Sequence, residues 1–161
     1  MESCPYTIRP AQDRDIPGVM RLLTQVDMVH HTIRPDLFKG PATKYTEDEL
    51  QAIFRNEKTP VFVCADEKGQ VLGHCFCCFK QHMDHNVLTD VKTLYIDDLC
   101  VDEANRGKHI GKALYDFVLD FAKASGCYNI TLNVWAGNDS AKAFYERQGM
   151  AFQKYEMETI L

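Results

Sequence analysis

The sequence predicts a single α/β domain, residues 1–161, built on a mixed sheet with helices on both faces. Two observations predict this fold. The strand–helix–strand run at 93–134 implies a right-handed crossover, which makes its two strands parallel. The three strands before the crossover helix are joined closely enough to be antiparallel. The chain is 45% hydrophobic and 11% aromatic, which is enough for one substantial core.

The N-terminal elements follow from local signals. Residues 6–10, "YTIRP", are predicted as a short first strand. A helix follows, with Asp13 or Asp15 as its cap and Pro17 in its first turn. The segment from His30 to Lys44 is expected to be a loop.

The middle of the chain is expected to hold a helix and a hairpin. Thr46 and Glu49 form a capping-box pattern, so a second helix should begin there. The strands "VFVCA" at 61–65 and "VLGHCFCCF" at 71–79 flank a turn and form the hairpin. The next strand is "TLYIDDLCV" at 93–101.

That strand changes phase at its acidic pair. Leu94 and Ile96 share one parity, and Leu99 and Val101 share the other. One extra residue at 97–98 would restore a single apolar face, which predicts a β-bulge. A strand buried on both faces is the alternative that periodicity leaves open.

The C-terminal half alternates helices and strands. A helix is predicted over 110–124, and Gly126 stops it. A strand at 128–135, a short helix at 139–147 and a last strand at 151–160 complete the fold.

Composition excludes several classes of protein. The net charge is −5 with no run of basic residues, so a nucleic-acid partner is not expected. The seven cysteines are odd in number and lie mostly in apolar runs, which favours a reducing, cytoplasmic compartment. Since no apolar run reaches 18 residues, a membrane partner is not expected either. The histidines and cysteines of "HCFCC" and "HMDH" lack the spacing of zinc ligands, so no metal is expected.

The segment "RGKHIG", 106–111, opens the third helix and resembles an anion-binding turn. It lacks both the P-loop spacing and the dinucleotide fingerprint. Unpaired amides around residues 107–112 could still wrap a pyrophosphate, with added charge from Arg106, Lys108 and Lys112. The alternative is a plain strand-to-helix turn.

Two segments together resemble the GNAT superfamily of N-acetyltransferases. "DDLCVDEANRGKHIGKALYDF" matches the acetyl-CoA pyrophosphate motif, and "NVWAGNDSAKAFYERQGM" matches the family's N-x-x-A-x-x-F-Y-x-x-x-G-F segment. The resemblance covers nearly the whole chain, although the N-terminal third agrees only in outline. It implies a GNAT-like, mostly antiparallel sheet with a splayed central parallel pair and acetyl-CoA as co-substrate. The residues that match the second motif are Asn138, Ala141, Phe144, Tyr145, Gly149 and Met150.

The resemblance also assigns residues to acetyl-CoA. His109 stands where the motif usually has its first glycine, and Gly111 holds the last position. We expect binding to survive, because histidine is tolerable in a helical conformation and among the less disfavoured residues at positive φ. The backbone of 99–101 would pair with the pantetheine arm, and Asn138 would bond it or cap its own helix. The residues implied are Leu99, Cys100, Val101, Arg106, Gly107, Lys108, His109, Ile110, Gly111, Lys112 and Asn138.

The catalytic roles come from the same resemblance. Tyr145 aligns with a tyrosine that protonates the departing thiolate, although a core tyrosine is the alternative. Asp97 aligns with a general base, and Asp98 is either the alternative base or a site of attraction for a cationic amine. His30 and His31 lie in the segment that often covers the acceptor in this family.

These observations predict an acetyl-CoA-dependent N-acetyltransferase acting on a primary amine of a small molecule. Acetylation of a protein N-terminus or lysine is one alternative. A non-catalytic acyl-CoA sensor is the other. By analogy with the family, a homodimer is compatible with the sequence.

Overall fold

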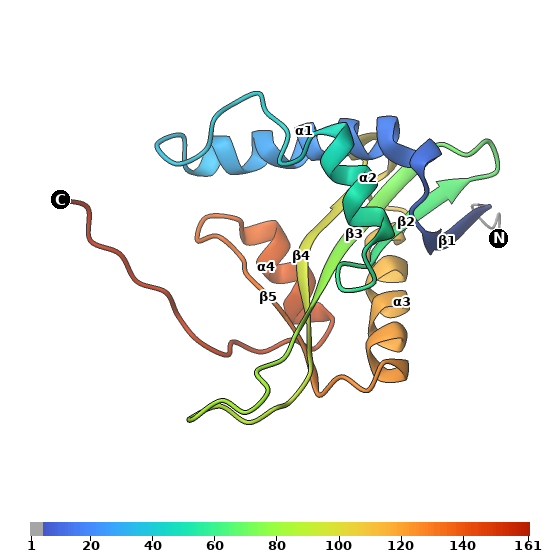
Figure 1. The fold of residues 1–161 in the computed structure, drawn as a ribbon. Helices are drawn as coiled ribbons and strands as arrows, with labels where there is room; N and C mark the ends of the chain where they lie inside the picture. The colour runs from blue at the N-terminus through green and yellow to red at the C-terminus, as the bar shows by residue number, and fades with distance from the viewer. Residues whose placement is uncertain (1–4) are drawn as a thin grey trace.

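A five-stranded sheet runs through the molecule in the order β1-β2-β3-β4-β5 (Figure 1). The structure, a computed structural model, describes residues 5–161. The first three pairings are antiparallel and the β4–β5 pairing is parallel, as the crossover predicts. The strands are β1 Tyr6–Pro10, β2 Val61–Asp66, β3 Val71–Lys80, β4 Thr93–Val101 and β5 Asn129–Leu132.

Helices cover both faces of this sheet. The helices α1 and α2 lie over one face, and α3 and α4 pack against the other (Figure 1). Two apolar cores result, one around Leu22, Leu50 and Phe76 on the α1 side and one around Leu94 and Leu114 on the α3 side. The helices are η1 Asp13–Asp15, α1 Ile16–Ile33, α2 Glu47–Arg55, η2 Glu103–Asn105, α3 Ile110–Ala124 and α4 Asp139–Arg147.

Several helix ends lie where the local signals place them. Thr46 and Glu49 form the capping box of α2, in which the Glu49 amide donates to Thr46 Oγ1 at 3.2 Å. Gly126 follows α3 with φ +75°, a conformation that glycine adopts without strain. Asn138 caps α4, since its side chain accepts from the Ala141 amide.

The predicted bulge in β4 is confirmed. Ile96 lies opposite Cys77 and Asp98 opposite Phe76, so Asp97 has no partner on β3. The extra residue restores one apolar face, because Leu94, Ile96, Leu99 and Val101 all join the core beneath α3.

The parallel strands β4 and β5 separate just before the bulge. Their pairing begins at Thr93 and Asn129 and ends at Ile96 and Leu132, although β4 continues to Val101. From residue 97 onward, therefore, β4 pairs only with β3 and has an open edge on the other side. This is the splay that the resemblance implies.

Three expectations need correction. First, α1 continues to Ile33, so His30 and His31 lie in its last turn and not in a loop. Pro35 explains where the helix stops, because a proline disfavours the helical conformation at the residue before it. Second, the strand predicted at 128–135 is shorter and covers only Asn129–Leu132.

Third, the strand predicted at 151–160 does not form. Residues 151–161 have no regular secondary structure and leave α4 as an extended segment (Figure 1, red). A strand needs a neighbour with which to share backbone hydrogen bonds, and this segment runs beside no strand of its own chain. Within residues 5–161, no helix combines the length and apolar character needed to cross a membrane.

Candidate active site

The turn between β4 and α3 is held by a buried aspartate, Asp102. Its carboxylate forms an ion pair with Arg21 at 3.0 Å and accepts from Gln25 Nε2 at 3.1 Å and Asn105 Nδ2 at 3.1 Å. Burial alone would raise the pKa of Asp102, but the bonds from Gln25 and Arg21 outweigh it and hold the pKa below its usual value. Asp102 thus ties α1 to the loop that carries the predicted phosphate-binding residues.

The first turn of α3 presents backbone amides that have no acceptor. The first backbone bond of the helix runs from the Ala113 amide to the His109 carbonyl at 3.0 Å. Within the part of the chain that the structure describes, the amides of Ile110, Gly111 and Lys112 have no partner, and no side chain caps the helix. Such a helix end carries a partial positive charge and binds anions.

Two residues before α3 adopt left-handed conformations. Gly107 has φ +79°, and His109 has φ 61° and ψ 18°. His109 therefore adopts the positive-φ alternative of the two that the sequence allows. A left-handed residue at this place turns the chain so that successive amides point to one side, which is the geometry of an anion-binding nest.

Gly111 lies close to α4 but has room for a methyl group. A Cβ built there would be 3.5 Å from both Phe144 and Val101, which is ordinary van der Waals contact. No contact inside the protein therefore requires glycine at this position. If glycine is required here, the reason is a ligand that approaches the backbone closely.

The basic residues of the turn are exposed. Lys108 Nζ donates to Asn105 Oδ1 at 3.0 Å, and Lys112 Nζ pairs with Asp116 at 2.6 Å. Arg106 and Asn138 line one cavity together with six residues of α1, which are Thr24, Gln25, Met28, Val29, Thr32 and Ile33. Ile110 contributes only its amide to the turn, since its side chain is buried in the core.

The residues 99–101 lie on the open edge of β4. Their side chains are already packed, Leu99 and Val101 beneath α3 and Cys100 beneath α1. Their backbone pairs with β3 on one side only. The other side is free to receive an extended, amide-containing molecule as an added strand.

Tyr145 lies on α4 and packs against the same core. Its ring contacts Phe144 at 5.1 Å and Tyr115 at 6.4 Å between centroids. Within residues 5–161, no group hydrogen-bonds its hydroxyl. Burial, and then Cys75 and Asp98, raise the pKa of Tyr145 well above its usual value, so the phenol stays protonated at neutral pH.

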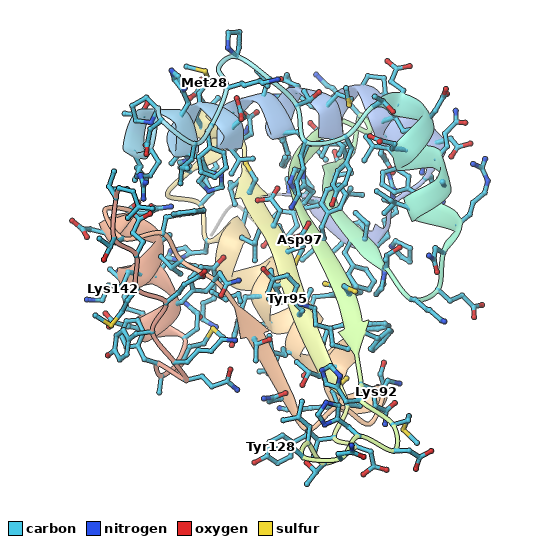
Figure 2. All side chains as sticks on the ribbon, turned by 60° about the vertical axis from the view of Figure 1, so that its left-hand side comes forward. Met28, Lys92, Tyr95, Asp97, Tyr128 and Lys142 are labelled. Atoms are coloured by element: carbon cyan, nitrogen blue, oxygen red, sulfur yellow. The ribbon has the colours of Figure 1, made fainter. Side chains whose placement is uncertain are left out.

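The two aspartates of the bulge have different surroundings. Figure 2 shows Asp97 midway along β4, where its Oδ2 accepts from Lys44 Nζ at 2.7 Å and from the Tyr45 hydroxyl at 3.0 Å. Asp98 is more buried, and its Oδ2 accepts from His74 Nε2 at 2.6 Å. His74 is fully buried, and its Nδ1 has no partner in the described residues.

The histidines at the end of α1 belong to an aromatic cluster. The His30 ring contacts Phe38 in a tilted arrangement with centroids 5.0 Å apart, and Phe38 meets Trp135 edge-on at 5.3 Å. His31 Nδ1 lies 2.6 Å from the Phe38 carbonyl. The cluster joins the end of α1 to the segment after β5, on the side where β4 and β5 separate.

Sequence reasoning missed Asp102, His74, Lys44 and Tyr45. The parity that His74 shares with the apolar Phe76 was the available signal that His74 lies on a covered face, whereas its pairing with Asp98 depends on the register between β3 and β4. Asp102 carried no signal beyond its place after a strand. Among the described residues, no group of three or more His, Cys, Asp or Glu side chains is arranged to hold a metal ion.

Comparison with known proteins identifies the family. The Acetyltransferase (GNAT) family matches residues 26–150, which is most of the chain. The chain belongs to the GNAT family. Glucosamine 6-phosphate N-acetyltransferase of Arabidopsis thaliana is 38% identical over 66 residues, a match that covers 41% of this chain and 42% of that protein.

Solved structures agree with this GNAT assignment. A mutant of the BH1408 protein of Bacillus halodurans superposes with a TM-score of 0.92 at 36% identity, covering 96% of this chain and 99% of that one. Glucosamine-6-phosphate N-acetyltransferase from Arabidopsis thaliana has the same fold, with a TM-score of 0.71 at 24% identity over 96% and 97% of the two chains. Family membership and the match to glucosamine 6-phosphate N-acetyltransferase support N-acetyltransferase chemistry for the GNAT domain, and the solved structures show that its fold is shared.

Proposed function

We propose that this GNAT protein transfers the acetyl group of acetyl-CoA to a primary amine of a small molecule by direct attack on the thioester. The observation that best supports this proposal is that two sets of backbone groups without hydrogen-bond partners lie next to each other. The uncapped start of α3 can bind a pyrophosphate, and the open edge of β4 leads directly into it. When bound, acetyl-CoA supplies an activated acyl group as a thioester.

The backbone would orient the bound co-substrate. The amides of Ile110, Gly111 and Lys112 bind the pyrophosphate, and Arg106, Lys108 and Lys112 neutralise it. Residues 99–101 pair with the amides of the pantetheine arm along the open edge. One of their N–H groups then donates to the thioester oxygen as charge builds there.

Tyr145 would supply a proton. The C–N bond forms as the amine attacks, the C–S bond breaks, and the departing thiolate takes the phenolic proton. The raised pKa of Tyr145 keeps that proton in place at neutral pH.

Asp98 suits the role of base better than Asp97. The Oδ2 atom of Asp97 already accepts two hydrogen bonds, from Lys44 and from Tyr45, so it is less free to accept a proton from the amine. Asp98 bonds one group, His74, and its charge acts on Tyr145. Asp98 would accept the proton that the amine loses, and His74 would be a positioning residue that fixes the carboxylate.

The acceptor class rests on the relatives and on charge. Glucosamine 6-phosphate N-acetyltransferase is named for a small molecule, and its substrate carries a primary amine. The net charge of −5 mildly favours a cationic acceptor.

The test is thiol release from acetyl-CoA with a panel of small amines, including glucosamine 6-phosphate, polyamines and a lysine peptide. We expect amine-dependent thiol release, and we expect its rate to fall at least about tenfold in Tyr145→Phe. A loss of this size or larger is what removal of one proton-transferring side chain causes. Asp98→Asn should lower the rate by a similar factor, whereas its neighbour Asp97→Asn serves as the matched control. Turnover of the peptide alone would overturn the small-molecule assignment. Equal losses in both aspartate variants would overturn the assignment of the base.

A further inference from the structure

The segment that joins α1 to α2 is anchored against the bulge of β4. Its Ala42 amide donates to Asp27 Oδ2 of α1 at 2.9 Å. The Tyr45 ring stacks on Phe76 of β3 with centroids 5.6 Å apart. The Tyr45 hydroxyl donates to Asp97 Oδ2 at 3.0 Å. The residues between these anchors therefore have defined positions beside β4.

Lys44 lies between these anchors and places its amine on Asp97. Its Nζ atom is 2.7 Å from Asp97 Oδ2, and its side chain is 49% exposed. An ion pair with so exposed a lysine contributes little to stability, so little stability depends on this contact. The pair does, however, hold a primary amine at the place where Figure 2 labels Asp97, midway along β4.

The amine of Lys44 lies where the acetyl group of the co-substrate is expected. Since β5 leaves β4 after Ile96 and Leu132, the open edge of β4 begins at Asp97. Under the proposed function, the pantetheine arm runs from the start of α3 along residues 99–101 of this edge. Its thioester end is then directed towards the bulge, which is also where the Lys44 amine is held.

The groups proposed for acetyl transfer act on the same place. Burial, and then the charges of Asp97 and Asp98, raise the pKa of Tyr45, which follows the lysine in the chain. Burial, and then Cys75 and Asp98, raise the pKa of Tyr145. Asp98, the proposed base, therefore lies within electrostatic range both of the residue beside the lysine and of the proposed acid.

Building on the proposed function, we propose that Lys44 is a self-acetylation site that takes the acetyl group from acetyl-CoA bound to the same chain. The Lys44 ammonium first gives one proton to Asp97. The neutral Nζ then attacks the thioester carbon, so that a C–N bond forms and the C–S bond breaks. The nitrogen loses its second proton to Asp98, and the departing thiolate takes the phenolic proton of Tyr145.

The transfer regenerates the other groups and removes one contact. Asp98 returns its proton to the Tyr145 phenolate, and Asp97 releases its proton to water. The products are acetylated Lys44, CoA and one proton. The neutral amide on Lys44 can no longer form an ion pair with Asp97, while the Tyr45 hydroxyl still holds the segment to β4.

Isotope-labelled acetyl-CoA, added to the purified full chain without any amine acceptor, tests the proposal. The label should appear at Lys44, where it blocks tryptic cleavage, and peptide mass spectrometry should find at least about tenfold less at Lys39. Lys39 reports purely chemical acetylation, because it is an exposed lysine of the same segment. The labelled fraction of Lys44 after a fixed time should not change when the protein is diluted, since the transfer occurs within one chain.

A pair of variants tests the role of the ion pair. Asp97→Asn should lower the labelling of Lys44 at least about tenfold, because Nζ loses both its anchor and the acceptor of its first proton. Asp13→Asn, which removes an exposed ion pair with Arg55, should leave the labelling of Lys44 as in the wild type. Equal labelling of Lys44 in the wild type and in Asp97→Asn would overturn the proposal.

The remaining outcomes separate this proposal from the proposed function. Equal label at Lys44 and Lys39, or labelling of Lys44 that rises with protein concentration, would overturn self-acetylation within one chain. Thiol release with small amines but no label at Lys44 would overturn it as well and would leave the proposed function standing. If neither the small amines nor Lys44 receive an acetyl group, both the proposed function and self-acetylation are wrong.

Discussion

His109 occupies a left-handed conformation where most residue types would be strained. Its φ of 61° is tolerable for histidine, and the neighbouring Gly107, at φ +79°, carries the rest of the turn without cost. The conformation of these two residues aims the amides of the next turn outward. At the scale of the residue, therefore, backbone conformation builds this part of the site more than side-chain chemistry does.

Gly111 gives a test in which binding and stability respond separately. Gly111→Ala should leave the melting temperature within about 2 °C, because the added methyl group meets only ordinary contacts and alanine favours a helix. It should weaken acetyl-CoA binding at least about tenfold, because the methyl group would block close approach of the pyrophosphate. Isothermal titration calorimetry and thermal melts measure the two effects.

Gly126 provides the opposite control. Its φ of +75° is unfavourable for alanine although nothing lies within 4 Å, so Gly126→Ala should cost about 1 kcal/mol of stability and leave binding unchanged. If Gly111→Ala binds acetyl-CoA like the wild type, the proposed pyrophosphate site at α3 is wrong.

Some residues of the site could be predicted from sequence and others could not. The bulge at Asp97 was predictable because the alternation of apolar and polar residues along β4 shifts by one position there. The pair of His74 and Asp98 was not, since it depends on how β3 and β4 align, which neither strand specifies alone. The role of Asp102 could not be predicted for a similar reason, because its partners Arg21 and Gln25 lie on a helix that is far away in sequence.

At the scale of the element, Asp102 determines how α1 holds the turn before α3. Asp102→Asn keeps the shape but places an amide among the donors of Arg21, Gln25 and Asn105. We expect a loss of about 2–4 kcal/mol in the free energy of unfolding, because a buried partner of a cation is removed. Acetyl-CoA binding should weaken as well, because the loop that carries Arg106 loses its anchor.

Urea unfolding and calorimetry of the same protein measure both quantities. Asp116→Asn is the matched control, because Asp116 pairs with Lys112 on the exposed surface of α3 and should change stability by less than about 0.5 kcal/mol. A stability loss in Asp102→Asn with unchanged acetyl-CoA affinity would show that Asp102 supports the fold but not the site.

The boundaries of the helices and strands show that local signals in the sequence specify some elements but not others. The helix predicted at 110–124 and the strand at 93–101 match the structure, because caps, glycines and periodicity specify them locally. The end of α1 was placed too early, although Pro35 was the available signal. The strand at 151–160 has the right pattern but no neighbour within the chain, and a strand cannot form from pattern alone.

At the scale of the whole molecule, a buried thiol with a raised pKa makes the free energy of unfolding fall at alkaline pH. Burial, and then Asp98, raise the pKa of the Cys100 thiol to about 12. Below pH 9 this thiol is protonated in both the folded and the unfolded chain, so its contribution is complete. Between pH 9 and pH 12 only the unfolded chain loses the proton, so stability falls by up to about 1.4 kcal/mol per pH unit for this group.

Cys100→Ala removes this dependence. The stability difference between wild type and Cys100→Ala should shrink by on the order of 1 kcal/mol between pH 8.5 and pH 10, as urea unfolding under reducing conditions would show. Leu99→Ala is the control, since it truncates the neighbouring side chain without removing a titratable group. A difference that stays constant with pH in both variants would contradict the assigned environment of Cys100.

The separation of β4 from β5 also bears on solubility. An unpaired row of backbone groups usually invites other chains to add to it and aggregate. Here the row at residues 97–101 begins where β5, bonded to β4 up to Ile96 and Leu132, leaves it. An extended amide chain bound along this row would cover its backbone groups and remove the exposed edge. Occupation of the edge by such a molecule would thus lower the risk of self-association that an open edge carries.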